Sequence, residues 1–292
     1  MDNMTAKVSL FARAYHYRNN KTHIFADDHA EKVLGVEYDE IAKNMMQGIS
    51  FFLPGFEGTK EEGLKLIVDR QLSPSVLGRS AFCEEMLKNL VSQGCSQYLI
   101  FASGYDTYAL RNENEALSVY ELDLPEIIED KNARIRMTGL SSCAHTVACN
   151  LADDGWTDKL RKAGFSSSEI SFGSLLGISY YLEKSEWKKL ISSVAEIMTE
   201  GSAICFDYPS EDESKETMTN KQLASGAGEK MKALYRDEEM RTILKEAGFD
   251  VRKNLDNREM TEMYFVEYND NNPNAQMAAP VGVGYIFAIK EK

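Results

Sequence analysis

Short apolar runs, bounded by polar or glycine-containing stretches, recur along the second two thirds of the chain. Such runs are typical of buried strands, and we place them at residues 97–102, 118–122, 145–150, 169–172 and 203–208. Residues 250–255 and 281–289 are expected to supply two closing strands. Apolar residues at helical spacing fill two of the intervals, at 185–199 and 229–248. Alternation of strands and helices predicts an α/β protein with a mostly parallel, doubly wound sheet covered on both faces.

The first part of the chain has a different, helical pattern. We expect residues 1–94 to form a helical cap that packs on the core rather than folding independently, and residues 95–292 to form the α/β core. The stretch 210–230 is rich in Glu, Ser, Thr and Gly, and we expect either a surface insertion or a lid there.

The segment from 97 to 131 carries the strongest chemical signal. It reads as a strand, a turn containing Gly104, a short helix and a second strand that ends in Asp123, 19 positions later. A doubly wound fold places an acid about 20 residues after its first glycine turn, where a carboxylate accepts hydrogen bonds from ribose hydroxyls. Glycine at the turn lets the backbone bend sharply and approach a ligand closely. The spacing therefore indicates a nucleotide-type cofactor, although it is weak evidence alone.

The residues around this spacing add a family resemblance. The runs FASGYDTYALR (101–111) and ELDLPEIIEDK (121–131) are close to a pattern LGAGLDTRAYR followed by EVDLPEVI, and similar runs occur at 5–17, 25–34 and 149–165. In these runs the chain resembles the leucine carboxyl methyltransferase family, including its bacterial relatives associated with polyketide O-methylation. The resemblance implies the class I methyltransferase fold, which is Rossmann-like and has an antiparallel strand in its last pair. It also implies S-adenosylmethionine as cofactor.

The resemblance also implies an O-methyltransferase whose acceptor is most often a carboxylate of a small molecule or peptide. Arg79 matches the family arginine that contacts the cofactor carboxylate, and we favour Asp123 for the ribose with Glu121 second. The full set of implied cofactor residues is Arg79, Ala102, Ser103, Gly104, Asp106, Glu121, Asp123, Asn150, Leu151 and Leu176.

Several positions keep alternatives open. Asp106 is equally suited to be a helix N-cap, and Tyr180 and Tyr181 either line the acceptor site or belong to the core or rim. Lys131 could pair with Glu126 or Asp130 as a surface ion pair and is left out of the site. We identify no catalytic base.

Three positions depart from the family pattern. Ala102 replaces the first turn glycine, Asn150 replaces an Asp expected at the adenine, and Leu176 replaces the Glu of an EGLLxYL-type motif. They leave open a catalytically inactive cofactor-binding or interaction protein on the same fold. An NAD-dependent oxidoreductase is a weaker alternative, because FASGYDTYALR lacks the GxGxxG pattern.

Composition excludes several classes of partner. The net charge of −13, from 46 acidic and 33 basic residues, argues against nucleic acid or an anionic membrane as the main partner. The chain has neither an apolar run long enough to span a membrane nor a signal pattern, so we expect a cytoplasmic protein. The four histidines form no HxxxH or HExxH pair and the five cysteines no CxxC, so we expect no metal site. The oligomeric state stays open.

Overall fold

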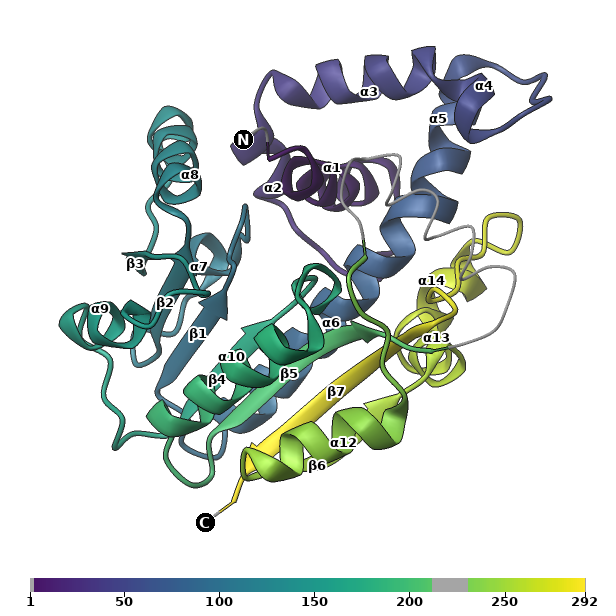
Figure 1. The fold of residues 1–292 in the computed structure, drawn as a ribbon. Helices are drawn as coiled ribbons and strands as arrows, with labels where there is room; N and C mark the ends of the chain where they lie inside the picture. Colours follow the sequence, from purple (N-terminus) through teal and green to yellow (C-terminus); the bar gives the residue numbers. More distant parts are fainter. Residues whose placement is uncertain (1–2, 212–230, 292) are drawn as a thin grey trace.

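A seven-stranded sheet forms the centre of the protein (Figure 1). The computed structural model describes residues 3–211 and 231–291. The strands lie in the order β3-β2-β1-β4-β5-β7-β6, and β7 runs antiparallel to both of its neighbours. Their bounds are β1 Gln97–Phe101, β2 Ser118–Asp123, β3 Ala144–Ala148, β4 Ser171–Leu175, β5 Ala203–Pro209, β6 Phe249–Leu255 and β7 Val283–Lys290. The predicted doubly wound sheet with an antiparallel closing strand is confirmed.

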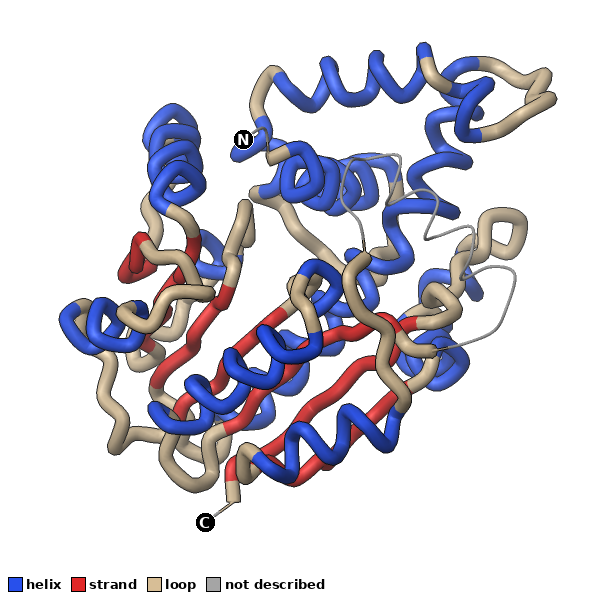
Figure 2. The backbone as a smooth tube through the Cα atoms, viewed as in Figure 1, coloured by secondary structure: helices blue, strands red, loops and turns tan. Residues whose placement is uncertain are grey.

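Helices precede the sheet and connect its strands (Figure 2). The first group is α1 Met4–Asn19, α2 Ala30–Leu34, α3 Glu37–Gln47, α4 Ile49–Phe52, α5 Lys60–Ile67, the π-helical turn η1 Val68–Leu72 and α6 Ser73–Val91. The second group is α7 Tyr108–Arg111, α8 Pro125–Thr138, α9 Trp156–Lys162, the 3₁₀ turn η2 Ser179–Tyr181, α10 Lys184–Ile197, α12 Asp237–Glu246, α13 Asn257–Tyr264 and α14 Val266–Asn271. None of the helices within the described ranges is long and apolar enough to cross a membrane.

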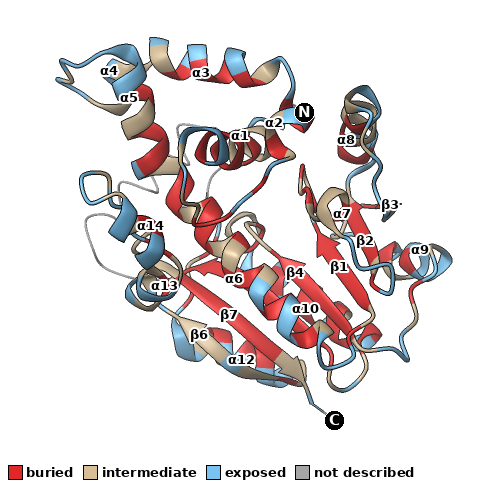
Figure 3. Ribbon diagram, turned by 180° about the vertical axis from the view of Figure 1, so that it is seen from behind, coloured by how far each residue is buried: buried red, intermediate tan, exposed pale blue. Residues whose placement is uncertain are grey.

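Side chains of alternate strand residues point to opposite faces of the sheet and form two separate cores. Leu99 and Phe101 of β1 belong to the core beneath α9, α10 and α12. Tyr98 and Ile100 belong to the core beneath α6 and α13 on the other face. Figure 3 shows these central strands buried, whereas β6 at the edge is only half-buried. Burial on both faces explains why the central strands read as nearly continuous apolar runs.

The N-terminal helices have a third core of their own, made by apolar residues of α1, α2, α3 and α5. Tyr105, from the turn after β1, joins that core and is 3% exposed. The helical region thus packs directly against the turn where the cofactor motif was found. The domain boundary at residue 94 stays a prediction.

All seven predicted strands are present, with ends that differ by a few residues. The helix predicted over 229–248 was wrong at its start, since α12 begins only at Asp237. The reason is that Tyr235 pairs with Ser210 in an isolated bridge and Arg236 is extended, with φ −81° and ψ 148°. The predicted insertion at 210–230 falls, apart from its first two residues, outside the described residues.

Candidate functional site

The turn after β1 has an unusual backbone. Ala102 and Gly104 both have φ of 50°, and Ala102 is the single non-glycine residue with positive φ in the described chain. Glycine adopts this left-handed conformation easily, whereas a residue with a Cβ does so at a cost. Strained backbone of this kind concentrates at ligand-binding turns. Asp106, two residues on, accepts a hydrogen bond from the Tyr108 backbone N–H at 2.7 Å, so it does support the start of α7.

Asp123 at the end of β2 is bound to this turn. Its Oδ2 accepts the backbone N–H of Gly104 at 2.6 Å, and its Oδ1 accepts that of Leu124 at 2.7 Å. Burial raises the pKa of Asp123, and the two N–H groups oppose that rise. Because each carboxylate oxygen accepts more than one hydrogen bond, both oxygens keep capacity for a pair of ligand hydroxyls.

A cavity of about 480 Å³ lies over the turn and the carboxyl ends of β1, β2 and β4. Its size is within the range of small-molecule and cofactor sites. The cavity brings together eight of the residues predicted from the sequence: Arg79, Ala102, Ser103, Gly104, Asp106, Asp123, Leu176 and Tyr181.

Glu121 does not line this cavity but makes a buried ion pair with Lys131, with Nζ 2.8 Å from Oε2. The two side chains are 2% and 1% exposed. The expected surface ion pair of Lys131 with Glu126 or Asp130 was therefore wrong. In the folded chain α8 packs along β2 and brings Lys131 over Glu121, which sequence proximity did not reveal.

Three other predicted residues lie outside the cavity lining, and their roles stay predictions. Asn150 is exposed after β3, where its Oδ1 accepts the N–H of Ala152 at 3.0 Å. Leu151 packs against the core beneath α9. Tyr180 donates its hydroxyl hydrogen bond to Asp207 at 3.0 Å.

Arg79 reaches the cavity from α6. Its Nη1 lies 3.3 Å from Oδ2 of Asp207, and its side chain is 17% exposed. Gly177, with φ of +69°, lies directly beside it, and a Cβ at Gly177 would come within 2.7 Å of Nη1. Glycine is therefore favoured at this position for two reasons: the backbone has a positive φ, and a side chain would come too close to Arg79.

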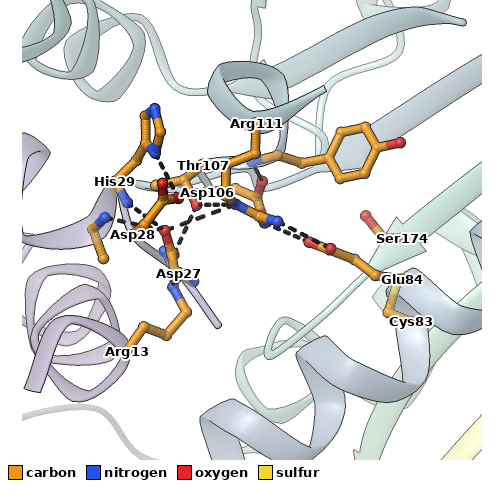
Figure 4. A network of polar contacts seen from close by, with 12 residues as sticks. Arg13, Asp27, Asp28, His29, Cys83, Glu84, Asp106, Thr107, Arg111 and Ser174 are labelled. Atoms are coloured by element: carbon orange, nitrogen blue, oxygen red, sulfur yellow. Dashed lines mark hydrogen bonds and ion pairs between the residues drawn. The ribbon is translucent and has the colours of Figure 1, made fainter. Parts of the chain in front are cut away.

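A buried polar network holds the cap against the same turn (Figure 4). Asp27 lies at its centre, 1% exposed, and accepts hydrogen bonds from Thr107 Oγ1 at 2.7 Å and from the Ala30 backbone at 3.0 Å. Arg13 of α1 pairs with Asp27 at 2.9 Å and also donates to the Tyr105 carbonyl at 2.7 Å. The network thus connects residues 25–29 and α1 to the turn after β1.

The sequence reasoning missed two contributions to the site. The first turns of α1 line the cavity through Thr5, Ala6 and Ser9. The run at 5–17 was noted as similar to the family, but nothing in it indicated a ligand contact. The second is Asp207, an acid directly after the apolar run ICF of β5; it does not line the cavity but accepts a hydrogen bond from Arg79, which does.

The described residues fit S-adenosylmethionine. Asp123 has acceptor capacity for ribose hydroxyls, and Arg79 supplies a guanidinium for a carboxylate. Ser103, 6% exposed and lining the cavity, has a buried Oγ with no hydrogen-bond partner among the described residues, and a ligand in the cavity can supply one.

Comparison with known proteins agrees with this geometry. The profile of the leucine carboxyl methyltransferase family matches residues 6–195. A candidate S-adenosyl-L-methionine-dependent methyltransferase of Bacillus subtilis strain 168, YktD, is 31% identical over 303 residues, covering 99% of this chain and 98% of the relative. A candidate methyltransferase of Saccharopolyspora erythraea is 32% identical over 140 residues, which cover 47% of this chain and 48% of the relative.

Solved structures share the fold. A DUF574 family protein from Streptomyces avermitilis has a TM-score of 0.61 at 12% identity and covers 98% of this chain and 97% of its own. A candidate methyltransferase from Thermobifida fusca has a TM-score of 0.57 at 13% identity, with coverages of 98% and 94%. The fold is the class I methyltransferase fold. With the family match and the full-length relative, these findings make the chain an S-adenosylmethionine-dependent methyltransferase that belongs to the leucine carboxyl methyltransferase family.

Proposed function

We propose that the protein transfers a methyl group to an oxygen, and that the acceptor is a carboxylate of a small molecule or peptide. S-adenosylmethionine, when bound, supplies an electrophilic methyl group on its sulfonium. In this proposal Asp123 holds the ribose hydroxyls and Arg79 the cofactor carboxylate. The turn from Ala102 to Gly104 gives the cofactor a backbone it can approach closely.

The observation that carries the choice of acceptor is the set of ionisable groups around the cavity. Its described lining contains neither His nor Lys. The hydroxyl of Tyr105 is hydrogen-bonded to Asp130 at 2.5 Å, and burial together with Asp130 raises its pKa far above the neutral range. A phenol or alcohol acceptor usually needs a general base, whereas a carboxylate is already ionised at neutral pH.

The described lining contains three acids, and two of them already accept backbone hydrogen bonds. Asp123 is bound by two backbone N–H groups, and Asp106 accepts the N–H of Tyr108. Glu126 lies in the first turn of α8, next to the end of β2. The protein therefore contributes mainly by holding the acceptor oxygen close to and in line with the methyl group, a positional effect that can lower a barrier by several kcal/mol, on the order of 7–11.

The test is a transfer assay with methyl-labelled S-adenosylmethionine and paired acceptors. Each pair consists of a carboxylic acid and the alcohol or phenol of the same skeleton. We expect label only in the acids, as an ester that releases volatile methanol in mild base. Label that stays attached in base, or that enters only the phenols or alcohols, would reject the carboxylate as acceptor.

A further inference from the structure

A second layer of polar contacts stands behind Arg79. Asp207, at the end of β5, is fully buried and accepts three hydrogen bonds through its carboxylate. Oδ1 accepts the backbone N–H of Gly177 at 2.7 Å, and Oδ2 accepts the Tyr180 hydroxyl at 3.0 Å and Arg79 Nη1 at 3.3 Å. A buried carboxylate is stable only when paired and hydrogen-bonded in this way.

These contacts connect three elements at one point. Arg79 comes from α6, Asp207 from β5, and Gly177 and Tyr180 from the turn after β4. Ser179 of the same turn donates to the backbone carbonyl of Asp207 at 2.8 Å. Asp207 thus holds the turn and the guanidinium together, and the turn backbone fills the space beside the guanidinium at Gly177.

The Asp207 carboxylate also stabilises the positive charge of Arg79 inside the protein. Burial favours a lower pKa for the guanidinium, but the Asp207 carboxylate, followed by Tyr180 and Tyr181, outweighs burial, so the pKa of Arg79 is raised. A guanidinium has five N–H donors in a fixed fork. The contact with Asp207 involves Nη1, which leaves donors for a ligand in the cavity that Arg79 lines.

We propose that Asp207 is a positioning residue for the amino-acid end of S-adenosylmethionine, acting through Arg79. It orients the Arg79 fork toward the cofactor carboxylate and holds the turn at Gly177 against it. This inference rests on the placement of the cofactor carboxylate at Arg79 in the proposed function. Leu176 stands where the family motif has Glu, so this turn has no acid of its own. Asp207 of the neighbouring strand β5 brings a carboxylate to the same turn.

The test compares two ligands by calorimetry. S-adenosylhomocysteine carries the amino-acid carboxylate, and 5′-methylthioadenosine lacks it. In Asp207→Asn the Oδ1 acceptor for Gly177 is kept, while the group facing Arg79 becomes a donor. We expect about 10-fold weaker binding of S-adenosylhomocysteine, the factor that corresponds to one lost charged hydrogen bond, and binding of 5′-methylthioadenosine within about 2-fold of the wild type.

A double-mutant cycle separates this role from a general structural one. If Asp207 acts through Arg79, Asp207→Asn adds nothing further to the loss caused by Arg79→Ala, because both changes remove one coupled unit. Fully additive losses would overturn the proposal, and so would equal losses for the two ligands. If both ligands bind Arg79→Ala as tightly as they bind the wild type, the cofactor carboxylate does not lie at Arg79. That result rejects the placement in the proposed function, whereas additive losses reject only the positioning role of Asp207.

Two further variants guard against misfolding of Asp207→Asn. Tyr180→Phe removes one donor to Asp207 without touching Arg79, and we expect S-adenosylhomocysteine binding within about 3-fold of wild type, since a neutral hydrogen bond contributes less than a charged one. Gly177→Ala places a methyl carbon 2.7 Å from the present position of Arg79 Nη1, so the guanidinium must shift. We expect it to weaken S-adenosylhomocysteine selectively, and unchanged affinity in a folded Gly177→Ala protein would overturn the proposal.

Discussion

The backbone N–H of Gly104 donates to Oδ2 of Asp123 at 2.6 Å, so the turn after β1 and the end of β2 are joined by a direct hydrogen bond. The two residues are the same pair whose 19-residue separation indicated a cofactor site in the sequence. The bond orients the carboxylate along the cavity edge before any ligand arrives. Orientation in advance reduces the entropy that binding must overcome.

Asp123→Ala should weaken S-adenosylmethionine binding much more than it destabilises the fold. A hydrogen bond to a charged group contributes about 1.5–3 kcal/mol, which corresponds to roughly 10- to 150-fold in affinity. The backbone N–H groups that lose their acceptor border the cavity, where water can replace it. Calorimetry and thermal melting of the same preparations measure the two effects. Asp154→Ala, which removes a surface acid 87% exposed, is the matched control, and equal affinity of both variants would defeat the ribose assignment.

Leu176→Glu should not improve cofactor binding in the wild-type background. The new carboxylate would enter next to Gly177, whose N–H is already bound by Asp207, and like charges close together disfavour each other. In the Asp207→Asn background the same change should be better tolerated, because one negative charge has been removed. Titrations of the wild type, the two single variants and the double variant with S-adenosylhomocysteine measure the direction of each change in affinity. A tighter-binding Leu176→Glu single variant would mean that the family role of that acid transfers here unchanged.

His16 should make stability depend on pH. Burial, followed by the charges of His23 and Lys65, lowers the pKa of His16 from 6.5 to about 3. The folded protein therefore keeps the imidazole neutral, with Nε2 accepting the Ile24 backbone N–H at 3.0 Å, whereas the unfolded chain takes up a proton below pH 6.5. The stabilisation is fully present above pH 6.5 and is lost as pH falls from there toward 3, by up to about 1.4 kcal/mol per pH unit.

Urea unfolding at pH 5 and pH 7.5 measures this contribution, with His16→Gln as the comparison, because a Gln oxygen can accept the same N–H but does not titrate. We expect the wild type to lose more stability than the variant between these pH values. Parallel losses in both proteins would assign the pH dependence to other groups.

Lys131→Met should destabilise the fold strongly. It would leave Glu121 buried without its cation, and breaking a buried pair on one side costs about 3–5 kcal/mol. Adding Glu121→Leu should recover most of the loss, since the uncompensated charge is then removed. Lys189→Met, at an exposed pair with Asp154, should change stability little. Denaturant midpoints of the wild type, Lys131→Met, the double variant and Lys189→Met measure these differences in stability. A mild effect of Lys131→Met would mean that water reaches Glu121.

The sequence by itself determined the elements and the first part of the site. Apolar runs located the central strands β1, β4 and β5 most clearly, because strands buried on both faces must be apolar along their length. The edge strands β3 and β6 are largely exposed or half-buried and carry a weaker pattern. Gly104 and Asp123 were found because backbone turns and strand ends leave local signatures, and the Pro at the start of α8 belongs to the same local pattern. The start of α12 was predicted less accurately, because an isolated bridge between Ser210 and Tyr235, which are distant in sequence, keeps the preceding residues out of the helix.

The tertiary structure alone decided which charges meet. Asp207 and Arg79 are 128 positions apart, and no local pattern announces their contact. The same holds for Arg13 at Tyr105, 92 positions away. Lys131 differs, since it lies near Glu121 in sequence and yet was expected at the surface. Whether a charged side chain is buried depends on how helices pack over strands, and that packing is a property of the assembled core rather than of the residues near it in the chain.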